Sequence, residues 1–132
     1  MQDRTGIKTS RKKAIGGSWD LCSDNENYNF YDINEDSATA KAEWHLELGS
    51  NVDVLVVEYP CVYETEKRLE LAAENITYRL EFPNLALLQK FKDDYSKKLF
   101  ENTFGLKDTP ANRKKVRLSS VLAAEHIHSQ EE

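Results

Sequence analysis

One stretch decides the fold that we predict for this chain: Ile76-Thr77-Tyr78-Arg79-Leu80-Glu81-Phe82-Pro83-Asn84. Apolar side chains occupy every second position up to Phe82, so one face of the segment packs and the other is wetted. This alternation predicts a half-buried antiparallel strand. Pro83 has no N–H for a sheet ladder and Asn84 is a favoured N-cap, so we predict that the strand ends there and that a helix begins.

The predicted helix runs from Asn84 to Gly105 and spans about five turns at roughly 3.6 residues each. Lysines and aspartates fill one face, as in a helix that covers a sheet. Gly105 suits the left-handed residue that follows many helices. The apolar positions recur at helical spacing and are Leu88, Phe91, Tyr95 and Leu99.

Five to seven strands are predicted before this helix. An all-β run that leads directly into one long helix is typical of pleckstrin-homology-like domains, and a small α+β domain whose helix covers a sheet is the alternative. We therefore predict a mainly β fold with one long C-terminal α-helix, a pleckstrin-homology-like antiparallel β-sandwich or barrel capped by the helix. Besides the strand at Ile76, the predicted strands lie at 18–22, 28–33, 41–48, 52–59 and 69–73.

One of these strands and one connecting segment carry further expectations. Residues 52–59 are apolar on both faces, so we expect that strand to be covered on both sides. The polar and acidic segment Ser23–Asn27 is predicted to be a turn.

The 132 residues are enough for one domain with a sizeable core and too few for two. Residues 1–13 contain five cations, one acid and almost no apolar side chains, so we expect a flexible basic arm. Residues 14–106 form the predicted domain. Residues 107–132 are expected to be a basic, turn-rich extension that ends in a mobile tail from about Ser119.

Composition limits the classes of function. The net charge of −5 argues against wholesale binding to nucleic acid or to an acidic membrane, because the summed field repels polyanions.

No apolar run approaches the roughly 20 residues that cross a bilayer, and the N-terminus shows no signal-peptide core. We expect a cytoplasmic protein, with the nucleus as the alternative compartment. Cys22 and Cys61 are far apart and lack neighbouring ligands, which indicates neither zinc nor a disulfide framework.

The sequence shows no catalytic or cofactor-binding motif. It contains no phosphate-binding glycine loop, no His-Glu-x-x-His and no Gly-x-Ser-x-Gly. His126 and His128 are interpreted as solvated side chains, and so is the carboxylate pair Asp93-Asp94. We therefore expect no enzyme activity, no cofactor and no metal.

The end of the predicted helix carries a family resemblance. It reads Leu99-Phe100-Glu101-Asn102-Thr103-Phe104-Gly105-Leu106-Lys107 and is followed by Thr109, Asn112 and Lys115-Val116. With the Trp44 strand and the Leu80-Glu81-Phe82 strand end, this run resembles the N-terminal pleckstrin-homology-like region of the fungal vacuolar-import-and-degradation family and its plant relatives, the defective-embryo-and-meristems proteins. The similarity runs from about Gly17 to Val116.

The resemblance implies a fold and a scaffold-like, protein-binding role, and it transfers no catalytic residue. We accordingly predict a protein-interaction domain, a scaffold or adaptor, that receives a protein or peptide along a sheet edge or beside the helix. The alternative is a peripheral membrane adaptor that contacts anionic lipid through the basic terminal segments. Because the expected first hairpin loop, Ser23–Asn27, is acidic, we expect membrane contact to be weak at most.

The predicted partner-binding site is the helix exit, where aromatic and apolar side chains stand among cations, a common composition for an interface. The alternative is that Phe100 and Phe104 only close the end of the core. The helix exit consists of Phe100, Phe104, Leu106, Lys107, Arg113, Lys114, Lys115 and Arg117.

Overall fold

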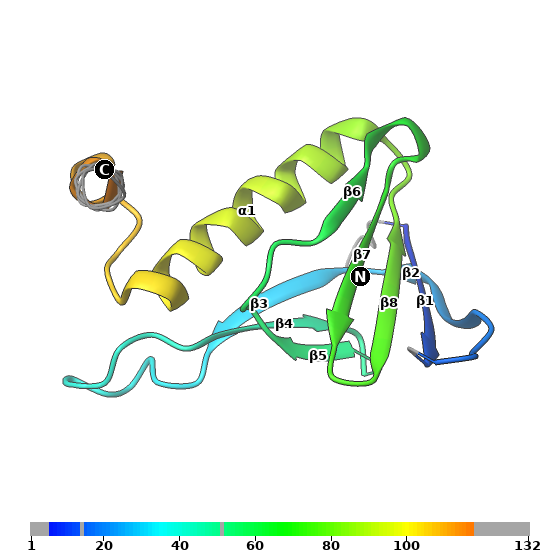
Figure 1. Cartoon of the computed structure of the whole chain (residues 1–132), viewed down its shortest axis with the longest axis horizontal. Helices are drawn as coiled ribbons and strands as arrows, with labels where there is room; N and C mark the ends of the chain where they lie inside the picture. The colour runs from blue at the N-terminus through cyan, green and yellow to red at the C-terminus, as the bar shows by residue number, and fades with distance from the viewer. Residues whose placement is uncertain (1–5, 14, 51, 118–132) are drawn as a thin grey trace, which may run out of the picture.

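The computed structural model describes residues 6–13, 15–50 and 52–117, and is mainly antiparallel β with one long helix (Figure 1). A short 3₁₀ turn lies at Glu64–Glu66, and residues 110–117 are also helical. The strands are β1 (Ile7–Lys13), β2 (Asp20–Glu26), β3 (Tyr28–Asp32), β4 (Trp44–Leu48), β5 (Val52–Leu55), β6 (Cys61–Tyr63), β7 (Arg68–Ala73) and β8 (Ile76–Glu81), and the long helix is α1 (Leu85–Phe104).

The strands form two sheets. One has the order β2-β1-β8-β7-β6 and the other the order β3-β4-β5. Only Asn27 separates β2 from β3, so the chain passes directly from the first sheet into the second. Each sheet keeps two edge strands, so the sheets are not closed into one barrel. The predicted β-rich fold with one long helix is confirmed at this level.

Helix α1 begins and ends where its capping residues predict. The Asn84 side chain accepts a hydrogen bond from the Leu87 N–H at 2.8 Å. Gly105 has a φ of 65°, and its N–H donates to the Glu101 carbonyl at 2.9 Å. Of the predicted apolar stripe, Leu88, Phe91 and Tyr95 are buried and Leu99 is half-buried.

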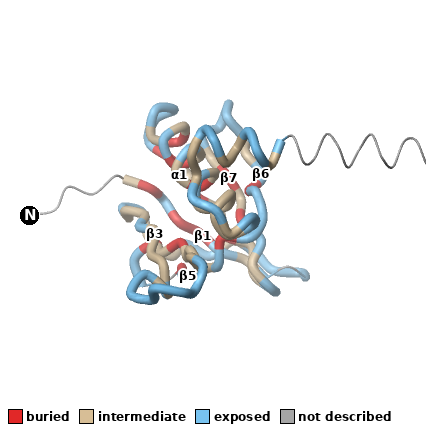
Figure 2. The backbone as a smooth tube through the Cα atoms, turned by 90° about the vertical axis from the view of Figure 1, so that its left-hand side faces the viewer, coloured by how far each residue is buried: buried red, intermediate tan, exposed pale blue. Residues whose placement is uncertain are grey.

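The core lies between the inner faces of the two sheets and α1 (Figure 2). Phe91 is its central aromatic residue, with ring centroids 4.9 Å from Tyr28 and 5.4 Å from Phe82. The Tyr28 contact is edge-to-face and the Phe82 contact is tilted, and such ring pairs stabilise the core beyond the burial of their area. The buried apolar residues are Ile7, Leu46, Leu48, Val52, Val56, Leu69, Leu71, Tyr78, Leu80, Phe82, Leu88, Phe91 and Tyr95.

The prediction of a flexible basic arm is wrong for residues 7–13. They form β1, which pairs with β2 on one side and with β8 on the other. Ile7 and Thr9 are buried, whereas Lys8 and Arg11 extend into solvent. Backbone hydrogen bonds to the neighbouring strands stabilise this strand. Counting apolar side chains in the sequence does not reveal these bonds. Residues 1–5 of the predicted arm lie outside the described residues.

The predicted turn at Ser23–Asn27 is also wrong, since β2 continues to Glu26. The first hairpin turns instead between Lys13 and Asp20, where Gly16 has a φ of 69° and Ile15 is 93% exposed. The expectation of weak membrane contact was based on the acidity of a segment that proves to be a strand.

Residues 110–117 are helical, so the prediction of a turn-rich extension is wrong there. The Thr109 hydroxyl accepts a hydrogen bond from the Asn112 N–H at 3.1 Å, and Pro110 takes the first helical position, where its missing N–H costs nothing. The predicted mobile tail from Ser119 lies outside the described residues.

Candidate functional site

Two incomplete sheet edges lie on either side of one hollow. β5 is the last strand of its sheet and pairs only with β4. β7 pairs with β8 along all six of its residues, but with β6 only over residues 68–70. Pro60, just before β6, lacks the N–H that would continue this ladder opposite Leu71. Among the described residues, no strand therefore pairs with the β6-facing side of Leu71–Ala73.

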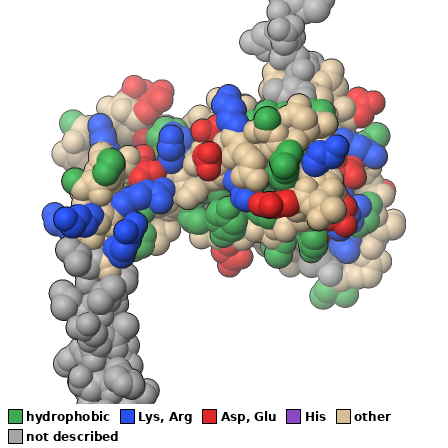
Figure 3. Space-filling view, turned by 90° about the horizontal axis from the view of Figure 1, so that it is seen from above, with side chains coloured by type: hydrophobic (Ala, Val, Ile, Leu, Met, Phe, Trp, Pro, Cys, Tyr) green, Lys and Arg blue, Asp and Glu red, His purple; other side chains and the backbone are tan. Residues whose placement is uncertain are grey.

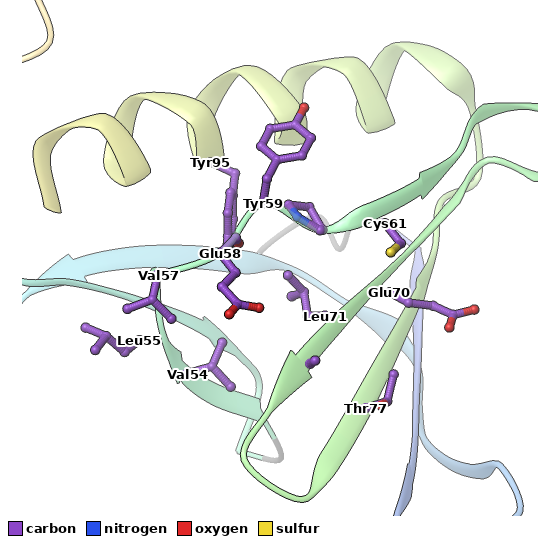
Figure 4. A pocket seen from close by; sticks show the side chains of 12 residues that line it. Val54, Leu55, Val57, Glu58, Tyr59, Cys61, Glu70, Leu71, Thr77 and Tyr95 are labelled. Carbon is purple, nitrogen blue, oxygen red and sulfur yellow. Dashed lines mark hydrogen bonds between the residues drawn. The ribbon is translucent and has the colours of Figure 1, made fainter. Parts of the chain in front are cut away.

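The hollow between these edges is the edge groove (Figure 4). It consists of two neighbouring parts of about 270 and 730 Å³, which share lining residues from both of its sides. Segment 53–61 lines one side, segment 70–78 lines the other, and Tyr95 of α1 contributes from above. Both open edges therefore border the same space.

The predicted strand 52–59 ends at Leu55. The Val56 N–H still donates to the Trp44 carbonyl at 3.1 Å. Beyond this point helix side chains satisfy the backbone. Asn102 Nδ2 donates to the Val56 carbonyl at 2.8 Å, and the Tyr95 hydroxyl donates to the Glu58 carbonyl at 2.6 Å.

Apolar side chains remain uncovered along this segment, contrary to the expected coverage on both sides. Leu55, Val57 and Tyr59 are 41%, 57% and 52% exposed. They are spaced two residues apart and all line the edge groove. A run of exposed apolar side chains beside an open strand edge is typical of an interaction surface.

The charged residues that line the groove are all acidic: Asp53, Glu58, Glu70 and Glu74. Glu70 lies 3.8 Å from Arg68 and 3.7 Å from Arg79. Asp53 accepts a hydrogen bond from the Tyr31 hydroxyl at 2.6 Å. Within the described part of the chain, Glu58 and Glu74 form no ion pair with Lys or Arg. Figure 4 shows the Glu58 carboxylate directed into the hollow.

Two tyrosines near the groove stay neutral at ordinary pH. Burial, with a contribution from Glu58, raises the pKa of Tyr95 to about 12. The hydrogen bond to Asp53 raises the pKa of Tyr31 to about 12. Both hydroxyls therefore act as hydrogen-bond donors, and neither adds negative charge near neutral pH.

The groove offers open backbone edges, apolar side chains and uncompensated negative charge. In the portion of the chain that the structure describes, no three or more His, Cys, Asp or Glu side chains gather so as to hold a metal ion. Cys61 is an exposed free thiol at the groove margin. This set of groups suits the binding of an extended polypeptide.

The structure brings part of the predicted helix exit together. The rings of Phe100 and Phe104 lie 5.0 Å apart, and the Arg113 guanidinium stands 5.1 Å from the Phe100 ring. Arg113 Nη2 also donates to Asp108 at 2.9 Å, and this bond lowers the pKa of the Asp108 carboxyl. Phe104 and Leu106 remain exposed.

The cations of the helix exit differ in surroundings. Arg113, Lys114 and Arg117 line a hollow of about 580 Å³ with Lys97 and Asp108. Lys107 and Lys115 are exposed but do not line it. Figure 3 shows Lys and Arg side chains gathered at this end of the molecule. The helix exit is therefore a basic surface, opposite in sign to the edge groove.

The run that carries the family resemblance fastens α1 to β4. Asn102 accepts from the Trp44 N–H at 2.8 Å and donates to the Trp44 carbonyl at 3.0 Å. Glu101 accepts from the Trp44 indole N–H at 3.0 Å and from the Asp108 N–H at 3.3 Å. These two side chains position the helix, the segment 56–60 and the helix exit relative to one another.

Sequence reasoning predicted a binding site along a sheet edge or beside the helix but identified none of the residues of the edge groove. One signal was present: Pro60 follows directly on an apolar run and interrupts strand pairing. The run was interpreted as a strand covered on both sides, so its exposed half was not considered as a surface.

Residues 17–117 match a family model described as "Domain of unknown function (DUF7135)". No curated protein matches the chain, and no solved structure matches it. Over the residues that the structure describes, no helix combines the length and the apolar character needed to cross a membrane.

Proposed function

The chain belongs to the DUF7135 family, and we propose that it acts as a non-catalytic protein-interaction domain, a scaffold or adaptor, that receives an extended peptide in the edge groove. The observation that carries this proposal is the pair of open strand edges on one hollow. An added strand would hydrogen-bond to the main chain of β5, of Leu71–Ala73, or of both.

Exposed side chains add to these backbone groups. Leu55, Val57 and Tyr59 offer apolar area on one side of the hollow, and Ala72 and Ala73 leave room on the other. Main-chain pairing supplies affinity in such a site, while pockets for alternate side chains supply specificity.

The order of elements supports a pleckstrin-homology-like assignment. If β2 and β3 are counted as one bent strand, seven strands precede α1. The resemblance to the vacuolar-import-and-degradation and defective-embryo-and-meristems proteins rests on the run Leu99–Lys107, whose Glu101 and Asn102 hold α1 on β4. A scaffold role agrees with both points.

Selection from a displayed library of eight-residue peptides tests the proposal. Enriched peptides should lose about tenfold or more in affinity for the double variant Val57→Ser, Tyr59→Ser, because half-exposed apolar contacts at two positions are removed. A matched control is Ile33→Ser, Leu21→Ser, which changes two side chains of similar exposure, 55% and 58%, outside the groove. Equal loss in both variants, or a library that yields no binder, contradicts the proposal.

The helix exit is our proposed second contact for a protein partner. Phe104 and Leu106 are exposed, and the Phe104 ring packs on Phe100, which Arg113 of the basic hollow covers. Aromatic anchors rimmed by cations favour an acidic partner surface.

A second candidate function is peripheral contact with anionic lipid. Ile15 is 93% exposed at the tip of the first hairpin, two residues after Lys13. An exposed apolar tip beside cations of β1 is a combination that binds membrane surfaces. Flotation with vesicles of phosphatidylcholine and phosphatidylserine tests it: binding should need the anionic lipid and fall for Ile15→Ser but not for Ile33→Ser. Equal flotation of both variants contradicts this function.

A further inference from the structure

We infer that the occupant of the edge groove is a cationic extended segment in which Lys or Arg alternates with apolar residues. The inference rests on the proposed function and adds the chemistry of the partner. Three features of the groove support the inference: its charge, the spacing of its apolar side chains and its open edges.

The charge of the groove has one sign. Its lining residues include four carboxylates and no Lys, Arg or His. Glu70 is compensated because it lies between Arg68 and Arg79, and Asp53 accepts a hydrogen bond from the Tyr31 hydroxyl. Glu58 and Glu74 have no cationic partner within the described residues. An incoming cation would supply the partner that these two carboxylates lack.

The positions of these two carboxylates suit an extended occupant. Glu58 belongs to the segment that continues β5, and Glu74 belongs to the turn between β7 and β8. They therefore lie on opposite sides of the groove, and both belong to the lining of its larger part. A strand passing between the two edges would meet negative charge on both sides.

The apolar spacing sets the rest of the pattern. Leu55, Val57 and Tyr59 recur every second residue, and side chains of a paired strand alternate in direction with the same period. Residues of the occupant that face this strip should be apolar, and the intervening residues are the ones that reach the carboxylates.

Synthetic eight-residue peptides test this inference. The set consists of alternating Val and Lys, alternating Val and Glu, alternating Ser and Lys, and the Val/Lys peptide with proline at two central positions. Each carries a fluorophore, and anisotropy gives the dissociation constant at about 50 and 300 mM salt. The Val/Lys peptide should bind at least tenfold more tightly than the other three, and its binding should weaken with salt.

Two protein variants locate the charge contact. The double variant Glu58→Gln, Glu74→Gln should weaken the Val/Lys peptide about fivefold, because each partly exposed ion pair contributes little. The matched control Glu35→Gln, Glu66→Gln removes two exposed carboxylates outside the groove and should leave binding within twofold.

Several results would overturn the inference. Tighter binding of the Val/Glu peptide would show an anionic or neutral occupant, and the proposed function would stand if that binding still needed Val57. Equal binding of the Ser/Lys peptide, or equal weakening by both glutamate pairs, would reduce the effect to general attraction to an acidic protein. Undiminished binding of the proline peptide would show that the occupant does not bind by strand pairing.

Discussion

The edge groove and the helix exit lie against the same helix, yet they present opposite chemistry. The groove is acidic and borders backbone edges that no strand occupies in the described part of the chain. The helix exit is basic, and its backbone is capped: Gly105 donates to Glu101, Thr109 accepts from Asn112, and Asn112 donates to the Lys107 carbonyl. On the proposed function, we expect main-chain pairing to dominate recognition in the groove and side-chain charge to dominate at the exit.

The largest expected effect is on the helix that both regions share. Phe91→Ala should cost ~3–5 kcal/mol of unfolding free energy, since Phe91 is fully buried among the rings of Tyr28, Phe30, Phe82 and Tyr95. Urea denaturation measures this loss. A cost under about 1 kcal/mol is typical of surface positions and would contradict the idea that one packed helix supports both regions.

The next largest effect is expected from loss of the hydrogen bonds that join α1 to β4. Asn102→Ala should cost ~1–3 kcal/mol, because it leaves backbone groups of Trp44 and Val56 unpaired. Hydrogen exchange should also speed up in residues 56–60, which form one wall of the groove. Asn112→Ala, which removes an exposed contact to Lys107, is the control and should leave the exchange of that wall unchanged.

The dependence of stability on pH tests the role of Tyr95, which lines the groove and is not part of the helix exit. The pKa of Tyr95 is about 12 in the folded protein and about 10 when unfolded, so its contribution to stability is complete below pH ~10 and declines as pH rises toward 12. Tyr95→Phe should cost ~1 kcal/mol near neutral pH through the lost bond to Glu58. The variant should also show a shallower decline in urea melts between pH 9 and 11, and an unchanged slope would contradict this assignment.

A change confined to the exit should leave the groove intact. Thr109→Ala removes the N-cap of residues 110–117 and should cost about 1 kcal/mol of helix stability there. Circular dichroism should show reduced helicity while binding of the Val/Lys peptide stays the same. Loss of peptide binding in this variant would mean that the two regions are coupled.

The smallest effect on stability is expected from charge reversal at the exit. Lys114→Glu with Arg117→Glu should change unfolding free energy by no more than about half a kcal/mol, since Lys114 and Arg117 are exposed. The variant should lose binding to an acidic partner at low salt and keep groove binding. If the unaltered helix exit captured the acidic partner equally well at low and high salt, charge would not be its means of recognition.

Local signals predicted the elements that depend on a few neighbouring residues. The capping roles of Asn84 and Gly105, and the burial of Phe91 and Tyr95, follow from residue type and helical spacing. The helix exit was predicted in the same way, as a run of aromatic and basic residues. Its composition is local, but the ion pair of Arg113 with Asp108 and the cover over Phe100 appear only in the folded chain.

Strand β1 and the groove depended on distant partners. Lys8–Lys13 has the composition of a solvated arm and becomes a strand because β2 and β8 pair with its backbone from residues as far away as Glu81. The exposed half of the run 52–59 has the composition of a buried strand, but β5 ends at Leu55 at the edge of its sheet, and no described strand pairs with the chain beyond it.

The sequence by itself determined the helix, its ends, its buried face and the β-rich class, because these depend on side-chain periodicity and on capping within a few residues. Only the tertiary structure decided which strand edges remain open and which carboxylates line the groove without a cationic partner among the described residues. Those features depend on backbone hydrogen bonds and through-space distances between segments far apart in the chain, and neither leaves a periodic pattern in the sequence.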